Sequence, residues 1–73
     1  PVMANVRVVK RPFGLVFDPT WDVYCGEEKL GWIENDHYSF EAHIPGARGS
    51  YSVHRTLDKA VNFLISKRES ANA

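Results

Sequence analysis

Apolar and polar side chains alternate along three closely spaced runs, residues 21–25, 30–34 and 38–44. Alternation with a period of two is typical of β-strands, because successive side chains point to opposite faces of a sheet. The connecting segments, residues 26–29 and 35–37, have lengths that are common between antiparallel strands. The pattern therefore predicts an antiparallel β-meander.

Shorter segments flank this meander on both sides. Residues 50–54 alternate and predict a fourth strand, and residues 5–9 predict a short N-terminal strand. Between the N-terminal strand and the meander, prolines and a glycine interrupt the chain, so residues 13–17 are predicted to be irregular or a brief edge strand. The Pro- and Gly-rich residues 45–49 predict a loop with Arg48 at its tip.

The period changes to that of a helix from Leu57 to about Lys67. Thr56 suits the N-cap, and the apolar residues of this segment fall on one arc. These are Leu57, Ala60, Val61, Leu64 and Ile65. The prediction is an α+β domain in which a single C-terminal helix packs on one face of a small antiparallel meander of three to four strands.

A chain of 73 residues has room for one domain. The predicted divisions are an N-terminal arm or edge strand over 1–17, a β-meander over 18–55, a helix over 56–68 and a frayed tail over 69–73. So short a domain has a small core, and the loss of one buried aromatic side chain is a large fraction of its stability.

The loop lengths also predict a register. Placing Cys25 opposite Leu30 puts Val23 opposite Trp32, and a three-residue second loop puts Trp32 opposite Phe40. The predicted core face then consists of Val23, Cys25, Leu30, Trp32, Phe40 and Ala42, continued by Tyr38 and Ile44. The opposite, polar face carries Asp22, Tyr24, Gly31, Ile33, Ser39, Glu41 and His43.

The net charge is zero but unevenly distributed. Residues 18–45 contain seven acidic side chains and one basic one, whereas residues 1–17 and 46–73 both have a basic excess. Such a dipolar surface steers association with a charged partner; the alternative is that the charges serve solubility alone. The single cysteine, Cys25, favours a reducing cytoplasm, and no apolar run approaches the length of a membrane span.

No motif for catalysis, cofactor binding or metal binding is present in the sequence. The three histidines and Cys25 match no zinc-site spacing. Asp22 and Glu41 are predicted to approach each other on the polar face, but the pattern supplies no pocket to hold a substrate beside them. The sequence therefore predicts a protein that is not an enzyme.

Protein binding accounts for more of the unusual features. Two interpretations of the apolar side chains in residues 13–17 are open. If they are exposed, they are predicted to anchor a protein partner, and if the arm packs against the sheet, they complete the core. Tyr24 and Ile33 form a second predicted patch. The predicted partner-binding residues are Arg11, Phe13, Phe17, Tyr24, Ile33 and Arg48. The size and the predicted architecture of the domain are similar to those of small regulators encoded by phages and mobile elements. This is an analogy of architecture alone. The expected function is that of a monomeric, cytoplasmic regulator that docks on a larger host protein or complex and inhibits or redirects it.

Nucleic-acid binding is the alternative. Sheets backed by a helix can contact DNA, and aromatic side chains on a sheet can stack on bases. The acidic residues predicted on the open side of this sheet disfavour phosphate contacts there. The basic residues that remain for such a role are Arg7, Lys10, Arg11, Arg48, Arg55, Lys59, Lys67 and Arg68.

Overall fold

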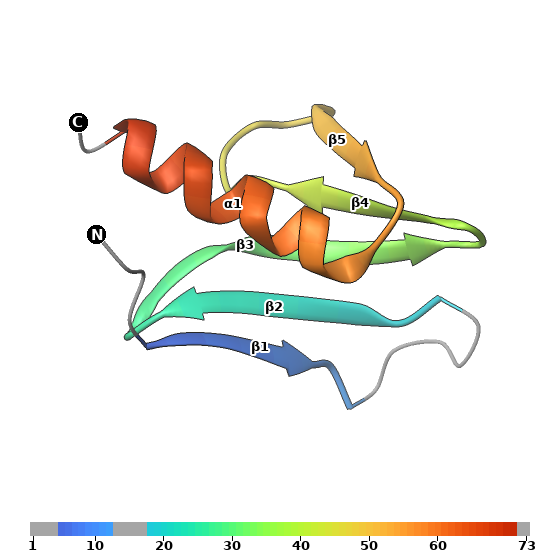
Figure 1. Ribbon diagram of the computed structural model, residues 1–73, viewed down its shortest axis with the longest axis horizontal. Helices are drawn as coiled ribbons and strands as arrows, with labels where there is room; N and C mark the ends of the chain where they lie inside the picture. Colours follow the sequence, from blue (N-terminus) through green and yellow to red (C-terminus); the bar gives the residue numbers. More distant parts are fainter. Residues whose placement is uncertain (1–4, 13–17, 72–73) are drawn as a thin grey trace.

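The computed structural model describes residues 5–12 and 18–71, which form one five-stranded antiparallel sheet and one helix (Figure 1). The elements are β1 (Val6–Lys10), β2 (Thr20–Cys25), β3 (Glu28–Asp36), β4 (Ser39–His43), β5 (Tyr51–His54) and α1 (Leu57–Ala71). Each strand pairs with the next along the chain. The predicted α+β meander with a C-terminal helix is confirmed. The sheet has five strands rather than three to four, because the short segments on both flanks of the meander pair with it.

Helix α1 lies across one face of the sheet, over β3, β4 and β5 (Figure 1). Its apolar arc supplies Ala60 and Leu64, which are buried against Val23, Ile33 and Ala42 of the sheet. The predicted N-cap is confirmed, since the Oγ1 of Thr56 accepts a hydrogen bond of 3.1 Å from the backbone N–H of Lys59. The helix continues to Ala71 through the predicted tail, where no glycine or proline ends it.

The register of β3 differs from the prediction because the first hairpin loop is shorter than predicted and because β3 contains a β-bulge. Cys25 pairs with Glu28 and Tyr24 with Lys29, but the next residue, Val23, pairs with Gly31. Leu30 is therefore the extra residue, and it is buried in the core together with its neighbour Gly31. Beyond the bulge, every side chain of β3 points to the face opposite from the one predicted.

Three predicted positions are wrong for this reason. Gly31, expected on the polar face, is buried on the helix side next to Leu64. Ile33, expected on the polar face, pairs with Trp21 and Ala42 and is fully buried at 0 % exposure. Trp32, expected in the core, pairs with Asp22 and His43 and lies on the face away from α1. The bulge adds one residue to β3, so it reverses the alternation that follows.

Both hairpin loops are also shorter than predicted, with two residues each, at 26–27 and 37–38. Gly26 and His37, which begin these loops, have φ values of 60° and 56°. Positive φ at these positions suits the tight turns that match the twist of paired strands. Tyr38, predicted to continue the core, instead lies at a loop tip and is 94 % exposed.

Gly31 permits the close packing at the bulge. A Cβ atom at this position would overlap the backbone carbonyl oxygen of His43 and lie 2.9 Å from the Cδ2 of Leu64. Gly31→Ala is therefore expected to lower the free energy of unfolding by about 1–3 kcal/mol, as overpacking in a core does. Urea denaturation measures this loss. An unchanged midpoint would contradict the close contact between β3, β4 and α1.

Candidate binding face of the sheet

The face of the sheet opposite α1, which we name the open face, collects side chains from all five strands. Because α1 is the one helix in residues 5–12 and 18–71 and packs on the other face, it leaves the open face uncovered (Figure 1). By strand register, the open face carries Arg7, Val9, Arg11, Asp22, Tyr24, Lys29, Trp32, Glu34, Glu41, His43, Tyr51 and Val53. An antiparallel sheet commonly leaves one polar face in water, but this face is rich in aromatic side chains.

Three rings form a row across the open face. Trp32 of β3, His43 of β4 and Tyr51 of β5 are successive cross-strand partners. The Trp32 and His43 rings are stacked with centroids 5.1 Å apart and planes 4° apart, and the centroids of His43 and Tyr51 lie 5.2 Å apart. Cross-strand aromatic pairs of this kind stabilise the sheet and hold one another in place. We refer to these three residues as the aromatic row.

Three basic side chains of the open face lie beside the aromatic row, and two of them bind the carboxylate of Asp22. Arg11 donates two hydrogen bonds to Asp22, of 2.9 Å from Nε to Oδ2 and 2.8 Å from Nη2 to Oδ1. The Nζ of Lys29 lies 3.0 Å from the same Oδ1 and 5.7 Å from the centroid of the Trp32 ring. The guanidinium of Arg7 lies over the Tyr24 ring at 4.9 Å. Each of these three cations therefore has a partner within the protein.

Asp22 is mostly buried, with its side chain 15 % exposed, and it links β2 to Arg11, which follows β1, and to Lys29 of β3. The hydrogen bonds from Arg11, and then the one from Lys29, outweigh burial and lower the pKa of the Asp22 carboxyl from 3.8 to about 2. A carboxyl with a lowered pKa stabilises the fold above its ordinary pKa, and this contribution is lost as the pH falls from about 4 towards 2.

Asp22→Asn is therefore expected to lower the free energy of unfolding at pH 7 by about 1–2 kcal/mol, because the partial exposure of Arg11 weakens the pair. The variant should also lose stability less steeply than the wild type between pH 4 and pH 2. Urea denaturation at several pH values measures both effects. An identical pH dependence in the two proteins would show that Asp22 does not contribute to acid stability.

Two further carboxylates lie on the other side of Trp32. Glu34 and Glu41 are direct cross-strand partners, and the indole Nε1–H of Trp32 donates a 3.0 Å hydrogen bond to the Oε2 of Glu34. The Nε2 of His43 lies 3.7 Å from Glu34 and 3.6 Å from Glu41. The predicted approach of Glu41 to Asp22 is wrong. Glu41 lies opposite Glu34, and Asp22 binds Arg11 and Lys29.

A hollow of about 310 Å³ borders the aromatic row. Trp32, His43 and Ile44 form one side, and the turn at 46–49, which includes Arg48, forms the other. The predicted loop thus brings Arg48 to the rim of the open face, beside two members of the aromatic row.

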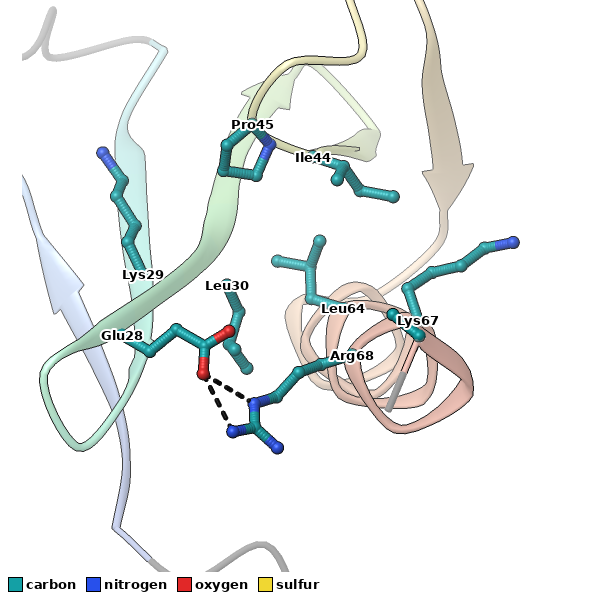
Figure 2. A pocket seen from close by; sticks show the side chains of 9 residues that line it. Glu28, Lys29, Leu30, Ile44, Pro45, Leu64, Lys67 and Arg68 are labelled. Atoms are coloured by element: carbon teal, nitrogen blue, oxygen red, sulfur yellow. Dashed lines mark hydrogen bonds and ion pairs between the residues drawn. The ribbon is translucent and has the colours of Figure 1, made fainter. Parts of the chain in front are cut away.

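A second hollow, of about 290 Å³, lies between the C-terminal half of α1 and the start of β3 (Figure 2). Leu30, Ile44 and Leu64 give it an apolar floor. At its rim, Arg68 binds Glu28 through Nε at 2.9 Å and Nη2 at 2.8 Å, as the dashed lines in Figure 2 show. This partly exposed ion pair connects α1 with the beginning of β3.

The structure places some of the predicted partner-binding residues together and separates others. Arg11, Tyr24 and Arg48 lie on the open face or at its rim. Ile33 does not, because it is fully buried on the opposite face. The predicted anchors Phe13 and Phe17 lie outside the described residues.

The predicted basic residues of the nucleic-acid alternative lie in different parts of the fold. Arg7 and Arg11 lie on the open face, whereas Lys10 pairs with the helix-facing Trp21 and therefore points to the other side of β1. Arg68 binds Glu28, and the Nζ of Lys67 lies over the Phe63 ring at 5.5 Å. The remaining ones, Arg48, Arg55 and Lys59, lie in the turn before β5 and around the start of α1.

Trp32, Glu34 and Tyr51 are not predicted from the sequence as residues of the open face. The alternation in residues 50–54 was a usable signal for Tyr51, which is 53 % exposed. For Trp32 and Glu34 the alternation along residues 30–34 predicts the wrong face, because their orientation depends on the bulge at Leu30.

Comparison of the chain with models of known protein families, with characterised proteins and with solved structures gives no match. Function is therefore argued from the geometry of the chain itself. Within the described residues, α1 is not long and apolar enough to cross a membrane.

Proposed function

We propose that this chain is a small, non-catalytic regulatory protein that binds a protein partner through the open face of its sheet. The observation that carries the proposal is the aromatic row on a face that α1 does not cover. Trp and Tyr dominate the energetics of protein interfaces, because each buries a large area at a small cost in conformational entropy. Next to this row, Val53 adds an apolar side chain that is 58 % exposed.

The arrangement of charges favours a protein partner over a nucleic acid. An interface typically has an aromatic centre and a polar rim, and here charged side chains of both signs surround the aromatic row. Arg7, Arg11 and Lys29 are engaged with Tyr24, Asp22 and Trp32, and Glu34 and Glu41 stand close to the row. Phosphate binding requires available cations, and neighbouring carboxylates oppose it.

The size of the molecule supports a role in binding rather than in catalysis. The hollows found among the described residues hold about 190–310 Å³ and offer little room to enclose a substrate, whereas a five-stranded face can cover part of a larger protein. On this proposal the chain acts as a monomer in the cytoplasm, and it inhibits or redirects a host protein or complex by occupying its surface. The single Cys25 supports a reducing compartment.

The proposal is tested by capture of partners from a bacterial lysate with the purified, tagged protein, with and without nuclease. The expected result is a protein that is retained in stoichiometric amount after nuclease treatment and is lost from a Tyr51→Asp variant. Retention of nucleic acid alone, with every protein released by nuclease, would overturn the proposal and favour the basic residues as the functional group.

A further inference from the structure

Glu34, Glu41 and His43 bring three potential metal ligands together on the open face. Glu34 and Glu41 face each other on adjacent strands, and His43 lies two residues beyond Glu41 on the same side of β4. The carboxylate oxygens and the imidazole nitrogen all lie within 4.8 Å of one another. Because the ligands stand on paired strands in the middle of a sheet, the backbone fixes their spacing.

The imidazole of His43 is aimed into this cluster. The Nε2 atom of His43 is buried and has no hydrogen-bond partner within the described residues, whereas the side chain as a whole is 18 % exposed. It points towards the two carboxylates, but the separations of 3.7 Å to Glu34 and 3.6 Å to Glu41 are too long for hydrogen bonds. The aromatic row holds the ring in this orientation, since Trp32 stacks on it and Tyr51 packs against it from the neighbouring strand.

The electrostatics of the cluster also favour a bound cation. Two carboxylates directly opposite each other in a sheet repel, and a buried nitrogen without a partner destabilises the fold. A cation between the three groups removes both penalties. The two distances from His43 are close to the roughly 3.4 Å that separates ligand atoms around a tetrahedral zinc ion with bonds of about 2.0–2.1 Å.

We propose that Glu34, Glu41 and His43 bind a divalent transition-metal ion, with Zn²⁺ as the reference case. An imidazole with two carboxylates suits Zn²⁺ and neighbouring transition metals better than Ca²⁺ or Mg²⁺, which prefer oxygen ligands alone. The hydrogen bond from Trp32 orients the carboxylate of Glu34, as outer partners of metal ligands commonly do. The Glu34 side chain is 46 % exposed, so an ion can reach the cluster from solvent.

The test is a titration of chelator-treated protein with Zn²⁺ by isothermal calorimetry, supported by the absorption spectrum of the Co²⁺ form. Wild type is expected to bind one equivalent. Glu41→Gln and His43→Gln are each expected to weaken binding at least about tenfold, because each removes a ligand. Glu34→Gln is expected to weaken Zn²⁺ binding as well. Because the Glu34 side chain is 46 % exposed, this variant keeps the test valid if a variant at Glu41 or His43 fails to fold.

His37→Gln is the matched control. The Nδ1 of His37 lies 3.1 Å from the carboxylate of Asp36 in an exposed loop, so this pair reports ordinary surface binding of a metal by a histidine and a carboxylate. The control is expected to bind Zn²⁺ as the wild type does. Absence of binding in the wild type, or binding that His37→Gln abolishes and Glu34→Gln leaves intact, would overturn the proposal. This readout is independent of partner binding, so its failure would leave the docking proposal standing.

Discussion

Replacing Ile33 with alanine is expected to lower the free energy of unfolding by about 2–5 kcal/mol, which is enough to unfold much of so small a domain. Ile33 is fully buried between Trp21 of β2 and Ala42 of β4, and it is among the largest side chains of the core. Removing most of its side chain leaves a cavity at the centre of the sheet. The neighbouring Trp32 is larger, but Trp32→Ala is expected to cost only about 1–2 kcal/mol, because Trp32 lies on the open face and is only partly buried.

This comparison also tests the bulge. Uninterrupted alternation along β3 would put Trp32 in the core and Ile33 outside, and Trp32→Ala would then be the more damaging change. Chemical denaturation followed by circular dichroism is the suitable measurement, since tryptophan fluorescence changes when Trp32 is removed. A larger loss for Trp32→Ala than for Ile33→Ala would contradict the described register.

The second large effect is expected in partner binding. Tyr51→Ala should weaken the affinity for a captured partner at least about 30-fold, as the loss of an aromatic hot-spot residue does. Tyr51 ends the aromatic row and is 53 % exposed, so its removal uncovers His43 without opening the core. Trp32→Ala should weaken binding as strongly, because it removes the ring at the other end of the row. Surface plasmon resonance with the purified partner measures these affinities.

Tyr38→Ala is the control for this prediction. Tyr38 is the most exposed of the large apolar side chains in the described residues, but it lies at the tip of the β3–β4 hairpin, away from the aromatic row. Its removal is expected to leave the affinity unchanged. Equal losses for Tyr38→Ala and Tyr51→Ala would show that general surface stickiness, and not the open face, governs binding.

Most of the fold could be predicted because local signals agreed with one another. The alternation in residues 21–25 and 50–54, the cap at Thr56 and the helical period that follows all indicated a meander covered by one helix. The predicted count of three to four strands is too low because the N-terminal segment, expected as an arm or a short edge strand, pairs with β2 from Val6 to Lys10. The helix end was placed too early, since residues 69–71 carry no signal that continues or stops a helix.

The residues of the open face could be predicted on β2 and β4 but not on β3, where the bulge lies. Asp22, Tyr24 and Glu41 were assigned to the correct face, because the alternation of β2 and β4 is unbroken around them. On β3, the insertion at Leu30 exchanges the roles of Trp32 and Ile33. The bulge in β3 places Gly31 in close contact with His43 and Leu64. Such a tertiary contact cannot be recognised from the local pattern of the sequence.

The most direct test of the open face as the binding surface is site-specific photo-crosslinking in nuclease-treated lysate. A photoreactive phenylalanine analogue replaces Tyr51 in one protein and Tyr38 in another, and crosslinked products are identified by mass spectrometry. The expected result is one protein partner crosslinked from position 51 and absent from position 38. The same products from both positions, or none from position 51, would contradict the claim that the aromatic row of the open face contacts the partner.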